Sequence, residues 1–178
     1  MRVITGTARG RKLKEPIGME IRPTTDSVKE AVFSIIQFDI EGRRVLDLFA
    51  GTGQLGIECL SRGAASVTFV DESREAVALI RENLSRCKMT GEVVQTESVG
   101  FLGRDGKYDL IFLDPPYGTG LLEKALEQAC GIDILSEHGI MVCESAVDQA
   151  LPALPAPYEK GREYRYGKIK ITLYRRGL

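Results

Sequence analysis

Short runs of Val, Ile, Leu and Phe alternate with amphipathic stretches along the chain from Arg44 onward. The runs have the length of strands, and the stretches between them repeat their apolar residues at helical spacing. The expected strands cover residues 44–49, 66–71, 92–96, 108–113 and 139–145, and the expected helices cover residues 54–62, 73–86 and 119–130. Strands that alternate with helices in this way form a parallel sheet with helices on both faces, so the pattern predicts an α/β fold.

The N-terminal segment has a different pattern. Residues 1–16 alternate apolar and polar positions around Gly6 and Gly10, which predicts a short β-hairpin. We treat residues 1–22 as a basic N-terminal hairpin arm.

One more helix and one more strand are expected outside the alternating region. Ser27 and Glu30 have the spacing of a capping box, and the apolar positions from Val28 to Ile36 predict a helix that packs on the sheet edge. Residues 169–174 alternate apolar and polar positions, which predicts a final strand with one wet face.

The size and composition of the chain suit one globular domain. With 178 residues, 43% of them hydrophobic, it can bury a core of its own, so we expect residues 1–178 to form a single domain and the protein to be a monomer. No apolar run reaches the roughly 18 residues of a membrane span. The N-terminus also lacks the apolar core of a signal peptide, so we expect a cytoplasmic protein with no membrane partner.

The metal-binding residue types are few. The four cysteines are widely separated and form no Cys-x-x-Cys pair, so we expect reduced, buried thiols. The single histidine, His138, lies in the expected turn before the strand at 139–145. Without clustered thiols or histidines, the sequence predicts no metal site.

The net charge of −1 hides an uneven distribution. Residues 1–22 carry +4 and residues 159–178 carry +5, which leaves −10 for the middle of the chain. Clustered Lys and Arg attract the phosphates of RNA, so basic ends around an acidic body favour an RNA partner. In the N-terminal arm the residues expected to contact RNA are Arg9, Arg11 and Lys12. Solvated charge at the chain ends is the alternative interpretation.

A glycine-rich turn follows the first expected strand. Gly51, Gly53 and Gly56 have dinucleotide-fingerprint spacing, and Asp71 ends the next strand twenty residues after Gly51. This pattern alone does not distinguish NAD from S-adenosylmethionine (SAM). The carboxylate of Asp47, just before the glycines, would repel a pyrophosphate but could hold the ammonium of a methionine moiety directly or through water. Asp47 therefore favours SAM.

The residues expected to bind the cofactor surround this turn and the ends of the next two strands. The glycines let the backbone approach the cofactor, and the helix N-terminus from Gly53 faces its carboxylate. Asp71 is placed to bind the ribose hydroxyls, and Glu97 to accept from the adenine amino group, although a solvated loop acid is an equal alternative for Glu97. The full set is Asp47, Phe49, Ala50, Gly51, Thr52, Gly53, Gly56, Asp71, Glu72, Glu97 and Ser98.

The tetrapeptide Asp114-Pro115-Pro116-Tyr117 directly follows the apolar strand at 108–113. Proline fixes φ, so backbone carbonyls in this turn cannot swing away, and the ring of Tyr117 can stack on a flat base. The Asp114 carboxylate and the Pro115 carbonyl can each accept an N–H and align an amine for methyl transfer. The target base must then be unpaired or flipped out. The alternative is that Asp114 only caps a following helix.

With these motifs located, the chain closely resembles the bacterial family that methylates guanine N2 in small-subunit (16S) ribosomal RNA. The resemblance rests on residues 1–6, 9–13, 22–26, 47–53, 60–64 and 112–117. It implies a class I SAM-dependent methyltransferase fold, which is Rossmann-like with a seven-stranded, mostly parallel sheet, with SAM as donor and a guanine in ribosomal RNA or an assembling small subunit as acceptor. It also implies that Arg22 and Thr24 lie over the active site. The third-strand motif, Thr96-Glu97-Ser98, and Gln54 depart from the family pattern.

Related turns occur in DNA adenine-N6 and protein glutamine-N5 methyltransferases. Those enzymes usually carry an added recognition or helical domain, whereas here only a basic segment of about 40 residues precedes the first core strand. A NAD-dependent oxidoreductase would explain the glycines but would leave Asp47 and the Asp114 turn without a role. A non-enzymatic RNA-binding module is the remaining alternative.

Overall fold

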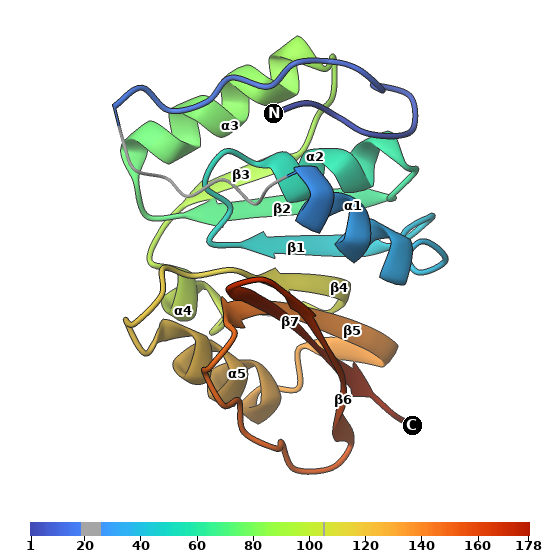
Figure 1. The fold of residues 1–178 in the computed structure, drawn as a ribbon, viewed down its shortest axis with the longest axis vertical. Helices are drawn as coiled ribbons and strands as arrows, with labels where there is room; N and C mark the ends of the chain where they lie inside the picture. Colours follow the sequence, from blue (N-terminus) through green and yellow to red (C-terminus); the bar gives the residue numbers. More distant parts are fainter. Residues whose placement is uncertain (19–25, 105) are drawn as a thin grey trace.

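The computed structural model describes residues 1–18, 26–104 and 106–178, and Figure 1 shows its fold. The strands form a seven-stranded sheet in the order β3-β2-β1-β4-β5-β7-β6. The strands are β1 (Arg44–Leu48), β2 (Ser66–Asp71), β3 (Glu92–Gln95), β4 (Tyr108–Leu113), β5 (Leu135–Ala146), β6 (Tyr158–Tyr166) and β7 (Ile169–Arg176). The helices are α1 (Asp26–Ile35), α2 (Gln54–Ser61), α3 (Arg74–Arg86), α4 (Ser98–Phe101) and α5 (Leu121–Gly131).

The first five strands are parallel, and β7 and β6 add an antiparallel pair at one side. Strand β1 lies between β2 and β4, so the strand order reverses direction between β1 and β4. In an open α/β sheet, the crevice at such a reversal is where ligands bind, outside the carboxyl ends of the strands. The α/β prediction is confirmed.

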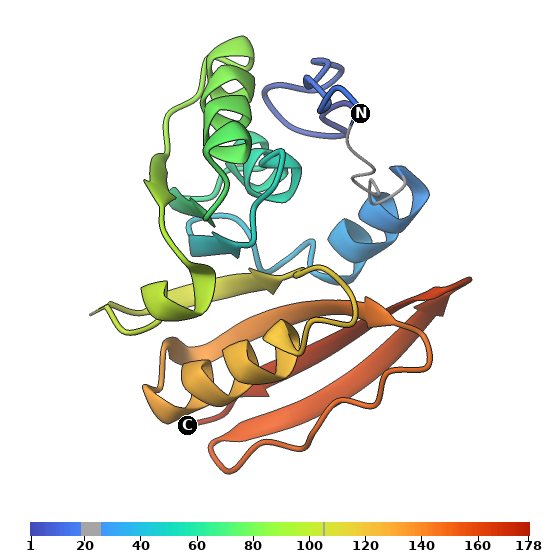
Figure 2. The same ribbon diagram turned by 90° about the vertical axis from the view of Figure 1, so that its left-hand side faces the viewer.

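Alternating side chains give the sheet two apolar faces. Val45 and Phe112 belong to the core shared with α1, α2 and α3, whereas Leu46 and Ile111 belong to the core shared with α4 and α5. Figure 2 shows α5 lying along β5. Both faces are therefore buried, as a parallel sheet requires.

The position of α1 corrects the expectation that it packs on the sheet edge. Phe33 of α1 packs on Phe112 of the central strand β4, with ring centroids 6.0 Å apart. The helix buries a wide apolar stripe, which finds more apolar surface over the central strands than beside an edge. It also begins at Asp26, so Ser27 lies within the helix rather than before it.

The N-terminal arm is packed onto α2. Arg2 and Lys12 form a single antiparallel bridge, so the expected hairpin has one ladder step only. The buried carboxylate of Glu58 accepts hydrogen bonds from the backbone N–H groups of Ile4 (2.8 Å) and Thr5 (3.0 Å) and pairs with buried Lys29 at 3.2 Å. This pairing satisfies a charge that would be costly to bury alone.

Strand β6 is an element that the hydrophobic pattern did not predict. Its residues are mostly polar and exposed, and its pairing with β7 shifts register between Lys160 and Glu163. An edge strand with a bulge leaves no clean alternation to read. Strand β5 begins earlier than expected and includes His138, where φ is 62°. Within the part of the chain that the structure describes, no helix is long and apolar enough to cross a membrane.

Candidate active site

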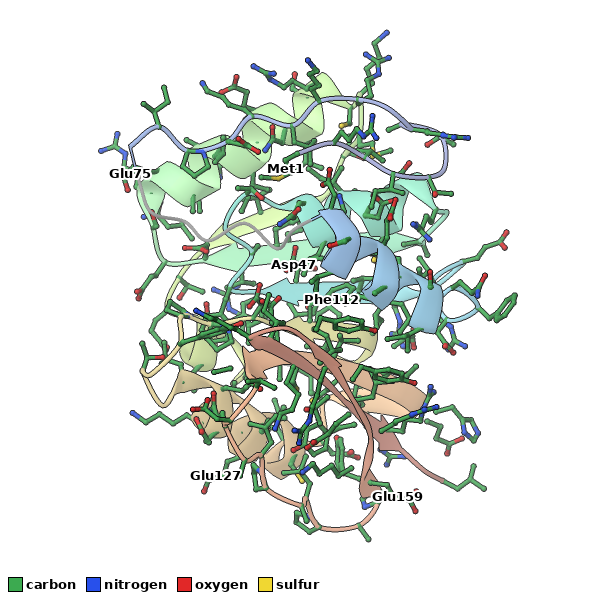
Figure 3. All side chains as sticks on the ribbon, viewed as in Figure 1. Met1, Asp47, Glu75, Phe112, Glu127 and Glu159 are labelled. Carbon is green, nitrogen blue, oxygen red and sulfur yellow. The ribbon has the colours of Figure 1, made fainter. Side chains whose placement is uncertain are left out.

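The two predicted motifs meet at the reversal of strand order. Strand β1 pairs in parallel with β4, and Leu48 lies opposite Leu113. The glycine-rich turn begins directly after Leu48, and the Asp114 turn begins directly after Leu113. Strands β1 and β4 are therefore neighbours, and the two turns lie at the same edge of the sheet. Figure 3 labels Asp47 and Phe112, which are register partners on these two central strands.

The glycine-rich turn has an unusual backbone that leaves open space at one glycine. Phe49, Gly51 and Gly53 have φ of 61°, 58° and 80°, in the left-handed region that favours glycine. A Cβ added at Gly51 would meet no atom within 4 Å, whereas one at Gly53 would lie 3.3 Å from Ile80. Gly51 therefore faces a space that a ligand can enter, and Gly53 faces the core.

Gly56 requires a correction, because it faces the sheet and not the cofactor side. A Cβ there would lie 2.3 Å from the ring of Phe69 on β2. Glycine at this position lets α2 approach the sheet closely, which is the packing role of the third glycine in dinucleotide-binding turns. Gly56 is therefore a packing glycine between α2 and β2 and does not face the space at Gly51.

Asp47 is buried, with an exposed fraction of 2%, and its Oδ2 accepts a hydrogen bond from the backbone N–H of Gly56 at 3.0 Å. This contact fixes the first turn of α2 to strand β1. Burial raises the pKa of Asp47 to about 8 because it disfavours the charged carboxylate, and the hydrogen bond from Gly56 opposes this shift.

The raised pKa of Asp47 predicts a pH dependence of stability. The unfolded carboxyl ionises near pH ~4. Between this value and the folded pKa of about 8, only the folded state holds the proton, so the free energy of unfolding falls as pH rises and levels off above the folded pKa. In urea unfolding without cofactor, Asp47→Asn should therefore gain stability relative to the parent as pH rises from about 5 to about 8. Curves that stay parallel over this range would contradict the assignment.

Asp71 connects the end of β2 to the glycine-rich turn. Its Oδ2 accepts from the Gly51 backbone N–H and its Oδ1 from the Ser73 backbone N–H, each at 2.9 Å. The carboxylate is half-buried beside the open space at Gly51, and Glu72 next to it is exposed. Thr52 is buried, and its hydroxyl lies 3.5 Å from the sulfur of Met1.

Glu97 begins the short helix α4, which the sequence pattern did not predict. Its carboxylate accepts from the backbone N–H groups of Val99 (3.0 Å) and Gly100 (2.6 Å), and Ser98 beside it is buried. The Glu97 side chain is exposed at the carboxyl side of β3. It therefore acts as a helix cap, and its contact with adenine stays a prediction.

The Asp114 turn contacts a residue that the sequence pattern did not single out. The hydroxyl of Tyr117 donates to Oε1 of Glu144 at 3.1 Å, and Glu144 is buried on β5. Leu113 pairs with Cys143, so the register places Asp114 next to Glu144. An acidic residue near the end of an apolar strand was the available signal for Glu144.

The turn itself is partly accessible and does not cap the next helix. Asp114 and Tyr117 are half-buried, Pro115 is buried and Pro116 is exposed. Helix α5 has Gly120 as its N-cap. The alternative that Asp114 serves only as the cap of this helix is therefore wrong.

The arm residues expected to contact RNA follow a turn that is bonded to the end of α2 opposite the glycine-rich turn. The turn that carries Arg9 and Arg11 is bonded to Ser61, the last residue of α2, by the backbone N–H groups of Thr7 (2.9 Å) and Ala8 (3.0 Å). The glycine-rich turn lies at the first residue of α2, about 11 Å away along the helix. Arg9 and Arg11 therefore lie beside the last residue of α2 and not beside the glycine-rich turn, and Arg9, Arg11 and Lys12 are all exposed. Arg22 and Thr24 lie outside the described residues.

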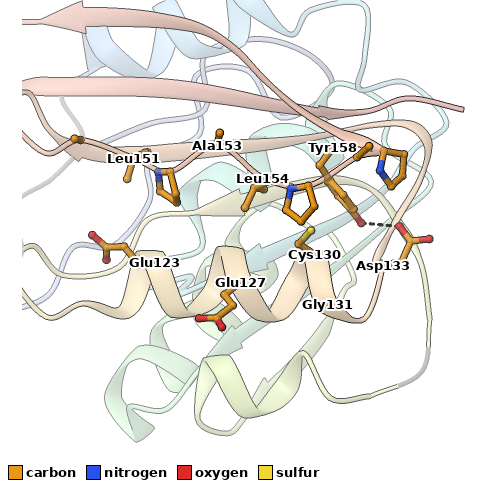
Figure 4. Close-up of a pocket in the computed structure, with 14 residues that line it drawn as sticks. Glu123, Glu127, Cys130, Gly131, Asp133, Leu151, Ala153, Leu154 and Tyr158 are labelled. Atoms are coloured by element: carbon orange, nitrogen blue, oxygen red, sulfur yellow. Dashed lines mark hydrogen bonds between the residues drawn. The ribbon is translucent and has the colours of Figure 1, made fainter.

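A separate groove of about 880 Å³ lies between α5 and the loop before β6 (Figure 4). Its walls include Glu123, Cys130, Leu151 and Leu154, and Tyr158 at one end donates to Asp133 at 2.8 Å. None of the described residues assigned above to cofactor or substrate lines this groove. It is a feature of the α5 face and not part of the candidate site.

Known proteins resemble the chain over nearly its whole length. The family model described as "Conserved hypothetical protein 95" matches residues 1–175. Ribosomal RNA small subunit methyltransferase D of Escherichia coli is 36% identical over 178 residues, covering 99% of this chain and 90% of that protein. The protein of the same name from Haemophilus influenzae is 33% identical, covering 98% of this chain and 93% of its own.

Solved structures agree with this comparison. The yhhF protein of Escherichia coli superposes with a TM-score of 0.89 at 36% identity, covering 99% of this chain and 98% of that one. A Thermus thermophilus protein superposes with a TM-score of 0.85 at 28% identity, covering 97% of this chain and 98% of that one. The class I methyltransferase fold is thereby confirmed, and the chain belongs to the Conserved hypothetical protein 95 family, together with the ribosomal RNA small subunit methyltransferases D.

Proposed function

We propose that this protein transfers a methyl group from SAM to the exocyclic N2 amine of a guanine in small-subunit ribosomal RNA. Its family makes it a SAM-dependent ribosomal RNA methyltransferase. The guanine and its N2 amine are the finer part of the proposal. The observation that carries the proposal is the meeting of the glycine-rich turn with the Asp114 turn where strand order reverses between β1 and β4.

The residues present fit SAM. The open space at Gly51 would be filled by the cofactor, and the backbone N–H groups at the N-terminus of α2 suit its carboxylate. The carboxylate of Asp71 accepts from the Gly51 backbone N–H, so it lies beside that space and would bind the ribose hydroxyls. Buried Asp47 accepts a hydrogen bond from the first turn of α2. It would contact the ammonium group of SAM through a bridging water. When bound, SAM supplies a methyl group activated by the sulfonium.

The Asp114 turn would position the acceptor. The N2 amine of guanine is a weak nucleophile because its lone pair is delocalised into the ring, so alignment matters more than a strong base. The Asp114 carboxylate and the Pro115 carbonyl each accept one N–H, which directs the lone pair toward the methyl. The ring of Tyr117 packs on the base, and the hydrogen bond to Glu144 fixes that ring in place.

The acceptor must be an unpaired or flipped-out nucleotide, because this turn begins at the end of a buried strand and cannot reach a stacked base pair. An acceptor panel tests the substrate class. Labelled SAM is offered with unmodified 16S ribosomal RNA, with assembled small subunits, with duplex DNA and with a glutamine-containing protein substrate. Label should enter the RNA or the subunit. Label that enters only DNA or protein would overturn the proposal.

A further inference from the structure

The hairpin of β6 and β7 brings its turn to the edge of the sheet where the active site lies. Glu144, which holds Tyr117, pairs with Ile171 of β7, and Ile171 pairs with Tyr164 of β6. Glu144, Ile171 and Tyr164 are therefore side by side on three neighbouring strands, β5, β7 and β6. Lys168, in the turn before β7, lies three residues before Ile171. At the rise of a strand, this places it about 10 Å from Ile171, in the direction of the carboxyl end of β5.

This hairpin carries cations that no described carboxylate neutralises. Glu163 pairs with Lys160 at 3.0 Å and with Lys170 at 3.6 Å, so these two lysines are compensated. Arg162, Arg165 and Lys168 are exposed, and within the described ranges no ion pair includes them. Arg175, near the end of β7, is likewise exposed and in no ion pair among the described residues, so the hairpin carries four uncompensated positive charges, three of which lie on β6 and its turn.

The same hairpin presents aromatic rings. Tyr164 and Tyr166 are half-buried on the α1 face of the sheet, and the guanidinium of Arg162 lies 5.3 Å from the centre of the Tyr164 ring. Bases of single-stranded RNA stack on such rings, while the flanking cations meet the phosphates. A basic and aromatic strand pair at the same edge of the sheet as the candidate active site is the arrangement that a single-stranded substrate needs.

We infer that the β6–β7 hairpin, through Arg162, Arg165 and Lys168, binds the RNA that flanks the target nucleotide. This inference rests on the proposed function and names the surface that holds its substrate. The N-terminal arm is the competing surface, but the arm's turn lies at the far end of α2. In Figure 1 the arm lies beside α3, whereas β6 and β7 lie at the other end of the sheet.

Two triple variants that remove the same charge decide between the two surfaces. One replaces Arg162, Arg165 and Lys168 with Ala; the matched control replaces Arg9, Arg11 and Lys12 with Ala. All six side chains are exposed, so both variants should fold. Binding to an unmodified 16S ribosomal RNA transcript is measured across a range of salt concentrations, and SAM binding is measured by calorimetry.

The hairpin variant should bind the transcript at least tenfold more weakly, and its salt slope should be flatter by about 2, since each lost phosphate contact removes roughly 0.7–0.9. The control should stay within about threefold of the parent with an unchanged slope. Both variants should keep parental SAM affinity. Equal weakening in both variants, or weakening in the control alone, would overturn the inference. A parent that binds SAM and RNA but transfers no methyl would instead count against the proposed function.

Discussion

Replacing Asp114 with alanine is expected to slow methyl transfer by roughly 10²-fold or more while SAM affinity stays nearly unchanged. The carboxylate is half-buried directly after β4, and β4 is the strand next to the one that leads into the glycine-rich turn. Its removal takes away one of the two acceptors that align the amine, and it leaves the open space at Gly51 intact. Single-turnover rates at saturating RNA measure the effect.

Asp148→Ala is the matched control for this variant, because Asp148 is an exposed acidic residue in the loop that follows β5. It should change neither the rate nor SAM affinity. A rate for Asp114→Ala within about threefold of the parent would show that the carboxylate has no orienting role. A large loss of SAM affinity would move Asp114 into the cofactor site.

The Gly51→Ala variant is expected to lose SAM affinity by an order of magnitude or more. The added methyl group would occupy the space that is open within 4 Å of this position. Gly53 is a poorer probe, since a side chain there would press on Ile80 and Ile57 and would disturb packing instead. Calorimetry with SAM and with its demethylated product measures the loss directly.

Backbone strain has to be separated from this effect, because φ at Gly51 is 58°. Gly42→Ala supplies the control, with φ of 72° and equally open surroundings, but in the loop before β1. Both variants should lose similar stability, about 1 kcal/mol, from the left-handed backbone. Only Gly51→Ala should lose SAM affinity. Parental affinity in folded Gly51→Ala would remove the glycine-rich turn from the cofactor site.

Much of the sheet could be predicted from the sequence because parallel strands are buried on both faces. The strands at 44–49 and 108–113 lie within a residue of β1 and β4, whereas the pairing of these two strands became known only from the structure. Strand β6 could not be predicted this way. Its edge position leaves most of its residues exposed to solvent, and its bulge interrupts the alternation of apolar and polar residues.

The site was less predictable than the fold, because its details depend on contacts between distant residues. Spacing alone could not tell that Gly56 faces Phe69 whereas Gly51 faces open space. The charge distribution in the sequence identified both basic ends but not where they lie in the fold. The position of the N-terminal arm depends on the buried carboxylate of Glu58, which binds the arm to α2. Glu144 became a candidate only when the register of β4 and β5 placed it beside Asp114.

The identity of the methylated nucleoside tests the central claim most directly. Unmodified small-subunit ribosomal RNA is labelled by this protein with SAM, digested to nucleosides and separated against standards. We predict that the label elutes with N2-methylguanosine, and that Asp114→Ala yields little of it in the same time. Label that elutes with N6-methyladenosine or with any other methylated nucleoside would contradict the account.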